Sequence, residues 1–277
     1  MEITATEQLA TLGHPQRLSV FRMLMRRFPD TVPAGELASG LGIKPNTLSN
    51  YLNALRHAGL VRQDRSGTSL LYSIEMKNVQ HMLDYLLNDC CRGRPEICLP
   101  SDKTSDRPAG RKYNVLFLCV GNSARSIFAE SILRTLADER FTAYSAGTHP
   151  SSGLSPIAVK VLKDKGHDVS TLRSKHMSEF AAPDAPEMDF VFTVCNQAAN
   201  EDCPAWDGQP ISGHWGVVDP VKATGTKAEK SLAFQNAYGA LRRRIEAFAA
   251  LPVESLDRIA LQSAVDDIAR TPDEDTL

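Results

Sequence analysis

The stretch from Cys119 to Ser126 restricts the fold of this chain more than any other part of the sequence. It reads Cys-Val-Gly-Asn-Ser-Ala-Arg-Ser, and an apolar run at residues 113–118 precedes it. Residues 127–133 follow with helical spacing, directly after the hydroxyl residue Ser126. The apolar run predicts a buried strand, and the later pattern predicts a helix. A cysteine is therefore expected at the end of a strand, and an arginine at the start of a helix.

This loop is predicted to form a cradle for a tetrahedral oxyanion. Its backbone N–H groups converge on one point, and the start of the helix adds positive potential. The planar guanidinium of Arg125 can hold two anion oxygens, and the same surroundings favour a thiolate at Cys119. A buried structural cysteine beside a surface arginine is the alternative, but the flanking strand and helix favour the cradle. The expected oxyanion-binding residues are Gly121, Asn122, Ser123, Ala124, Arg125 and Ser126.

The cradle residues resemble the low-molecular-weight tyrosine phosphatase family, and its arsenate reductase branch in particular. The resemblance extends from about residue 113 to residue 270. It implies an α/β domain with a parallel four-stranded sheet. Strand-like runs at residues 141–147 and 188–194 alternate with helical segments at residues 155–165, 227–250 and 255–270. That alternation predicts helices on both faces of the sheet and a site at the carboxyl ends of the strands.

The resemblance also implies a catalytic set of Cys119, Arg125, Asp219, Cys195 and Cys203. In the arsenate reductases that this chain resembles, cysteines corresponding to Cys195 and Cys203 shuttle a disulfide. Asp219 precedes a proline and resembles the family's general acid, which can give a proton to the leaving oxygen. The alternatives are two idle thiols and an ordinary Asp-Pro turn.

No metal and no tightly bound cofactor are expected. Some members of the family bind potassium near the cradle, and Asn122, Glu130 and Ser145 match such a site. However, Lys175 stands where a carboxylate would be needed. A disulfide relay implies an external thiol reductant, either thioredoxin or glutathione with glutaredoxin.

The first part of the chain shows the element order of an α+β winged helix-turn-helix domain. Two helical patterns between residues 6 and 27 precede a short helix and a glycine turn at residues 33–43. A helix at residues 45–59 follows, with Pro at its start and Gly at its end, and then a hairpin at residues 60–74. This order resembles the ArsR/SmtB type of repressor over about residues 6–90. A small helical module with a polar surface is the alternative.

The helix at residues 45–59 is expected to bind double-stranded operator DNA. Its outward face carries short polar groups that can reach base edges and phosphates in the major groove. Because members of the ArsR/SmtB family are dimers, we expect a homodimer in which residues 76–88 pack as the dimer helix. Residues 1–95 hold 11 Lys and Arg against 8 Asp and Glu, while residues 113–277 hold 16 against 22. The expected DNA-binding residues are Asn46, Thr47, Ser49, Asn50, Asn53, Arg56 and Arg65.

Three cysteines follow the expected dimer helix at residues 76–88 and lie close together in the sequence: Cys90, Cys91 and Cys98. Many ArsR-type repressors carry a cysteine pair in the first helix of the motif, but residues 34–38 of this chain contain none. The cluster resembles the C-terminal cysteine cluster of another ArsR subgroup. Three thiolates suit trivalent arsenic, whereas zinc normally takes four ligands and no histidine lies near. We therefore predict an arsenite-sensing site, with three unrelated thiols as the alternative.

Length and composition are those of a two-domain globular protein. The chain has 277 residues, of which 42% are hydrophobic and 23% are charged. The expected domains are residues 1–95, with the thiol cluster reaching residue 98, and residues 113–277, joined by a linker at residues 99–112. No apolar run approaches the roughly 20 residues that span a bilayer. The first residues lack the regions of a signal peptide, so a cytoplasmic location without membrane contact is expected.

The sequence thus predicts an arsenic-responsive repressor fused to a thiol-dependent arsenate reductase. Cys119 would attack arsenate, and Cys195 and Cys203 would carry the disulfide relay that releases arsenite. One alternative is a low-molecular-weight protein tyrosine phosphatase fused to a DNA-binding regulator. Another is a repressor that senses an oxyanion without catalysis.

Overall fold

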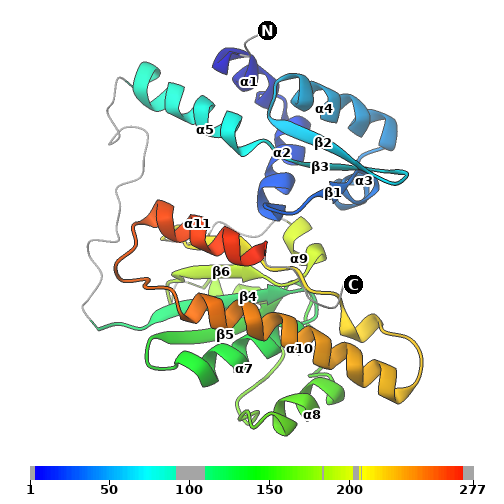
Figure 1. Cartoon of the computed structure of the whole chain (residues 1–277), viewed down its shortest axis with the longest axis vertical. Coiled ribbons are helices and arrows are strands. Elements are labelled where there is room, and N and C mark those ends of the chain that lie inside the picture. Colours follow the sequence, from blue (N-terminus) through cyan, green and yellow to red (C-terminus); the bar gives the residue numbers. More distant parts are fainter. Residues whose placement is uncertain (1–3, 92–109, 183, 202–205, 207, 271–277) are drawn as a thin grey trace. The chain divides into compact units, whose positions relative to one another are not determined.

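The computed structural model describes residues 4–91, 110–182, 184–201, 206 and 208–270. The chain divides into two compact units, Met1–Pro108 and Ala109–Leu277, which are drawn in Figure 1. Each unit has its own apolar core. Among the described residues, no helix is long and apolar enough to cross a membrane.

The first unit is a winged helix-turn-helix fold, as predicted. A three-stranded antiparallel sheet has the order β1-β3-β2, in which β2 and β3 form the predicted hairpin. The short strand β1 was not predicted. The elements are α1 (Ala5–Leu12), α2 (Pro15–Arg27), β1 (Val32–Pro33), α3 (Ala34–Leu41), α4 (Pro45–His57), β2 (Val61–Ser66), β3 (Ser69–Ile74), α5 (Met76–Tyr85) and the π-helical turn η1 (Leu86–Cys90).

Local sequence signals set the ends of the helices in this unit. Proline is the first residue of α2 and of α4, where its missing N–H costs nothing. Gly42 ends α3 with φ of 62°, a left-handed conformation that glycine adopts without strain. One face of α4 packs into the core through Leu48, Leu52 and Leu55, so the polar face of the helix is exposed to solvent.

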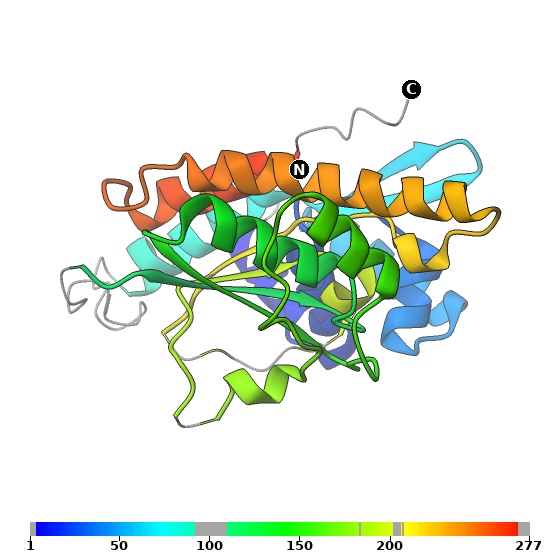
Figure 2. The same cartoon turned by 90° about the horizontal axis from the view of Figure 1, so that it is seen from below.

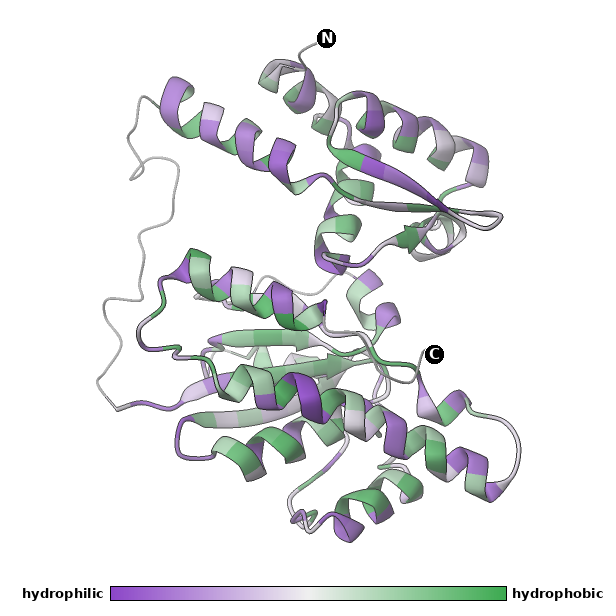
Figure 3. Ribbon diagram, viewed as in Figure 1, coloured by the Kyte–Doolittle hydropathy of each residue, from purple (hydrophilic) through white to green (hydrophobic). Residues whose placement is uncertain are grey.

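The second unit is built on a parallel four-stranded sheet of order β5-β4-β6-β7, which confirms the predicted fold class. The central strand β4 (Tyr113–Cys119) pairs with β5 (Phe141–Gly147) and with β6 (Phe190–Thr193), and β7 (Ile211–His214) forms one edge. The strands are mostly apolar in Figure 3. Such runs are expected for strands that are buried on both faces.

The two faces of this sheet are covered differently. Val115 and Phe117 of β4 pack in the main core with α7 (Arg125–Ala137), α8 (Pro156–Asp164), α10 (Lys227–Ala249) and α11 (Arg258–Ala269). Leu116 and Leu118 point the other way and pack with the 3-10 segment η3 (Met177–Phe180). Figure 2 shows α7 and α10 on one side of the sheet and η3 on the other. Helical segments therefore lie on both faces, as expected, but the described residues cover the second face with a short 3-10 segment.

A short helix, α9 (Asn196–Asn200), was not predicted from the sequence. Five residues with one alanine pair and no charged residue give little periodicity, so sequence spacing did not reveal the helix. The helix begins directly after Cys195, whose sulfur accepts a hydrogen bond from the Ala198 amide. This placement puts a predicted site cysteine at the cap of a helix.

Candidate functional site: a cysteine cradle at the carboxyl edge of the sheet

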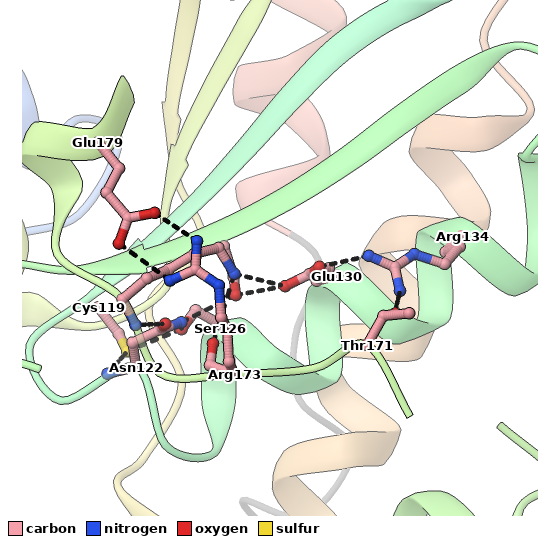
Figure 4. Close-up of polar contacts among 10 residues, drawn as sticks. Cys119, Asn122, Ser126, Glu130, Arg134, Thr171, Arg173 and Glu179 are labelled. Atoms are coloured by element: carbon pink, nitrogen blue, oxygen red, sulfur yellow. Dashed lines mark hydrogen bonds and ion pairs between the residues drawn. The ribbon is translucent and has the colours of Figure 1, made fainter. Parts of the chain in front are cut away.

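Cys119 is the last residue of β4, and the following loop turns back over its sulfur. The Asn122 amide donates a hydrogen bond to Cys119 Sγ at 3.1 Å, and Ser126 Oγ lies 2.9 Å from the same sulfur (Figure 4). The thiol is 3% exposed. The loop thus places a backbone amide and a hydroxyl group directly against the sulfur.

The helix α7 begins at Arg125, as expected from the sequence. No side chain caps it, because Ala124 is the residue before the first turn. Amides at an uncapped helix start can bind an anion. Ser126 was expected as the hydroxyl at the helix start, but it lies within the first turn and its hydroxyl contacts Cys119 instead.

Asn122 fixes the shape of the loop. Its backbone has φ of 43°, a left-handed conformation that asparagine adopts more readily than most residues, and its side chain is fully buried. Asn122 Nδ2 donates to Ser126 Oγ at 2.9 Å and to Ser145 Oγ at 2.8 Å. Asn122 Oδ1 accepts from the Lys175 amide at 2.8 Å. The side chain thus ties the cradle to α7, to β5 and to the segment before η3.

Through Ser145, Asn122 is connected to a cluster of charged residues around the buried Glu130 (Figure 4). Ser145 Oγ donates to Glu130 Oε2 at 2.5 Å, and Glu130 also pairs with Arg134 of the same helix. Lys175 Nζ lies 3.4 Å from Glu130 Oε2. Burial lowers the pKa of Lys175, while the Glu130 carboxylate opposes that shift. The ammonium supplies the positive charge beside Glu130, so these residues do not fit a potassium site.

A second loop backs the cradle, and sequence reasoning missed it. The amides of Thr148, His149 and Ser151 donate to the carbonyls of Cys119, Val120 and Gly121 at 3.0, 3.0 and 2.8 Å. The signal was Gly147, where an added Cβ would lie 2.4 Å from the Val120 carbonyl oxygen. Only glycine allows this close approach of two backbones.

Arg125 connects the cradle to the loop that carries Asp219. Its Nη2 lies 2.8 Å from Asp219 Oδ2, and its Nη1 donates to the Val217 carbonyl at 3.1 Å. The Arg125 and Asp219 side chains are 12% and 24% exposed. The predicted arginine and the predicted acid are therefore neighbours, although 94 positions separate them in the sequence.

Cys195 lies at the neighbouring strand end. The register pairs Leu118 with Thr193, and the Val194 amide donates to the Leu118 carbonyl at 2.8 Å. Burial raises the pKa of the Cys195 thiol, and the nearby Cys119 raises it further. Arg125 and the amides of Ala198 and Val120 act in the opposite direction. The structure thus brings the two thiols to one edge of the sheet, while the predicted relay residue Cys203 lies outside the described residues.

The predicted DNA-binding residues lie on α4 and on the hairpin of the first unit. Asn46, Ser49, Asn50, Asn53, Arg56 and Arg65 are exposed, and Thr47 is half-buried. Three of these side chains also make local contacts. Ser49 Oγ donates to the Pro45 carbonyl, Arg56 contacts Gln63, and Arg65 Nε donates to the Gly67 carbonyl.

The predicted arsenite site is only partly described. Cys90 is an exposed free thiol at the end of η1, and Cys91, which follows it, is disulfide-bonded. Cys98 lies outside the described residues. Three thiolates on one ion would therefore require the reduced protein.

Comparison with known proteins agrees with this geometry. Residues 114–260 match the low molecular weight phosphotyrosine protein phosphatase family, and residues 12–64 match a helix-turn-helix domain. An arsenate reductase of Bacillus licheniformis is 37% identical over 139 residues, which are 50% of this chain and 96% of that protein. An arsenate reductase of Shouchella clausii is 38% identical over 138 residues, again 50% and 96%.

Among solved structures, one described as an arsenate reductase in the phosphate binding state has a TM-score of 0.42 and 27% identity. It covers 50% of this chain and 97% of its own. The resemblances inferred from the sequence, to the phosphatase family with its arsenate reductases and to a helix-turn-helix domain, are confirmed.

Proposed function

This chain belongs to the low-molecular-weight phosphotyrosine protein phosphatase family through residues 114–260, and from that premise we propose that its second unit reduces arsenate to arsenite. The observation that carries the proposal is a second buried thiol, Cys195, which follows the strand β6 that pairs with β4 and so lies at the same edge of the sheet as Cys119. Hydrolysis of a phosphate ester needs one nucleophile, an arginine and an acid. Reduction of arsenate also needs a second thiol, which forms a disulfide with the first as arsenic gains two electrons.

The first step takes place in the cradle. Arsenate is held by the amides of residues 121–126 and by the Arg125 guanidinium. The Cys119 thiolate attacks arsenic, a sulfur–arsenic bond forms, and one hydroxide leaves with a proton from Asp219. Because the Asp219 carboxyl lies 2.8 Å from the Arg125 guanidinium, both side chains can act on the same bound arsenate.

The second step transfers two electrons to arsenic. The Cys195 thiolate attacks Cys119 Sγ, and a disulfide forms between the two sulfurs. The electron pair of the sulfur–arsenic bond goes to arsenic, which leaves as arsenite. Cys203 then attacks Cys195, restores the Cys119 thiol and presents a Cys195–Cys203 disulfide to an external thiol reductant, either thioredoxin or glutathione with glutaredoxin.

A variant at the second thiol tests this assignment against a phosphatase. Cys195→Ser should stop multiple turnover of arsenate with a thiol reductant, because serine cannot form the disulfide. Slow hydrolysis of an aryl phosphate should remain, since it depends on Cys119, Arg125 and Asp219. If aryl phosphate is the better substrate and the variant keeps full activity on arsenate, the enzyme is a phosphatase and the relay is wrong.

For the first unit we propose sequence-specific binding of double-stranded DNA as a homodimer that represses transcription. The support is the exposed polar face of α4 in a helix-turn-helix unit. Asn50→Ala should weaken binding to the DNA upstream of the protein's own gene, and affinity should fall steeply with salt. If the Asn50→Ala variant binds this DNA with wild-type affinity, the assignment of α4 as the DNA-binding helix is wrong.

Arsenite released by the second unit is proposed to act on the first. Reduced Cys90, Cys91 and Cys98 would bind arsenite directly after α5 and so change the spacing of the two α4 helices in the dimer. Arsenite should release the protein from DNA, and arsenate should do so only with a reductant and Cys119 present. The sensor assignment fails if a Cys90→Ser/Cys91→Ser variant is released at the wild-type arsenite concentration.

A further inference from the structure

His214, which no sequence pattern singled out, carries an inference that rests on the proposed disulfide relay. We propose that His214 is a positioning residue for the relay and holds the Cys195 segment through hydrogen bonds on both sides of that cysteine. It is the last residue of β7, the edge strand next to β6, and it is 2% exposed.

Both ring nitrogens of His214 contact residues that flank Cys195. Nδ1 lies 2.8 Å from Thr193 Oγ1, two positions before the cysteine. Nε2 lies 3.2 Å from Asn196 Oδ1, one position after it. An amide oxygen can only accept, so Nε2 carries the proton, and the Thr193 hydroxyl can donate to Nδ1 of the neutral ring. One imidazole thus joins the end of β6 to the first residue of α9.

The backbone at Gly216 passes close to this pair. A Cβ added at Gly216 would lie 2.6 Å from Asn196 Oδ1 and 2.7 Å from His214 Nε2. Gly216 itself is held, because Arg244 Nη1 donates to its carbonyl at 3.1 Å. The glycine lets the chain pass close over the hydrogen bond, and a larger residue would displace one of its partners.

The geometry matters for the relay because Cys195 must leave one partner to reach another. Its sulfur accepts from the Ala198 amide at 3.4 Å, a long contact in the first turn of α9. Attack on Cys119 requires the sulfur to leave this contact while residues 193 and 196 stay in place. Displacement of a reacting group by about 1 Å can cost on the order of 100-fold in rate. The proposed attack of Cys119 on arsenic precedes this step and assigns no role to His214, Thr193 or Asn196.

The test compares two reactions in His214→Leu, His214→Gln and the wild type. His214→Leu should lower multiple turnover of arsenate about 10- to 100-fold and leave aryl phosphate hydrolysis within about twofold. His214→Gln can still donate to Asn196 Oδ1 and should recover most of the loss. Asn196→Ala, at an exposed position, should reproduce the His214→Leu result without removing a buried group.

A matched control removes another hydrogen-bonded histidine. His167 lies 2.7 Å from Thr135 Oγ1 and 2.7 Å from Tyr238 OH, among α7 and α10. His167→Leu should leave the ratio of the two activities unchanged. Wild-type arsenate turnover in His214→Leu and in Asn196→Ala, or an equal loss of both activities in both variants, would overturn the positioning role.

A further measurement separates this inference from the proposed function. In a Cys203→Ser background, one equivalent of diamide oxidises two thiols to a disulfide and is itself reduced to the hydrazine. The rate of the Cys119–Cys195 bond, followed by alkylation and mass spectrometry, should fall about 10-fold or more in His214→Leu. This readout needs no arsenate. If the wild type forms the disulfide but no arsenite, the reductase assignment fails alone, whereas an unchanged rate in His214→Leu overturns the positioning role alone.

Discussion

Replacement of Arg125 by lysine tests whether the cradle works through a planar, two-pronged cation. In the structure Nη2 pairs with Asp219 at 2.8 Å while Nη1 donates to the Val217 carbonyl at 3.1 Å. A lysine ammonium keeps the charge but cannot make both contacts, nor hold two oxyanion oxygens in parallel. A hydrogen bond to a charged group contributes about 1.5–3 kcal/mol. The loss of one such bond in the transition state corresponds to roughly a 10- to 150-fold lower kcat/KM.

The assay measures kcat/KM of Arg125→Lys for arsenate with a thiol reductant and for an aryl phosphate without one. Both values should fall by similar factors, because the two substrates share the cradle. Arg242→Lys is the control, since Arg242 pairs with Glu246 on the exposed face of α10. Surface pairs of this kind contribute about 0.2–1 kcal/mol, so both activities should stay near wild type. A loss below about threefold in Arg125→Lys, or a loss for arsenate alone, would refute the shared cradle.

Three further predictions follow from the same geometry. Burial raises the pKa of Cys195, so its thiol is mostly protonated near neutral pH and its thiolate fraction is still growing at pH 9. Arsenate turnover should therefore increase from about pH 7 to about pH 9, and a flat profile would contradict a rate-limiting attack by Cys195. Lys175→Met should lower the free energy of unfolding by about 3–5 kcal/mol in urea titrations, because Glu130 loses a buried partner, and Glu130→Gln in the same chain should restore part of the loss. Asn122→Ala should slow arsenate and aryl phosphate reactions alike, because it releases the loop from Ser126 and Ser145; an effect on one substrate only would contradict its role.

Local signals were enough to predict the element that carries the nucleophile. The apolar run before Cys119 and the helical spacing after Arg125 are short-range patterns, and the structure has a strand and a helix there. The order of elements in the first unit was predicted for the same reason. The missed strand β1 contains two residues and depends on pairing with β3, so its own sequence carries no signal.

The contacts that complete the site are long-range, and sequence spacing could not predict them. Lys175, in the segment before η3, reaches Glu130 of α7 across 45 positions. His214 reaches Asn196 across 18 positions because β6 and β7 are neighbours in the sheet. Periodicity gives no order of strands, and without that order neither pair can be inferred. Resemblance assigned roles to Cys195 and Asp219, while their neighbours became visible only in the fold.

A single turnover of the Cys203→Ser variant tests the central claim most directly. With the last relay thiol removed, one equivalent of arsenate should yield one equivalent of arsenite and a disulfide between Cys119 and Cys195 that stays on the protein. Arsenite can be quantified in the filtrate, and the disulfide can be identified by mass spectrometry of the digested chain. Arsenite formation without that disulfide, or the disulfide without arsenite, would contradict the proposed transfer of electrons from the two thiols to arsenic.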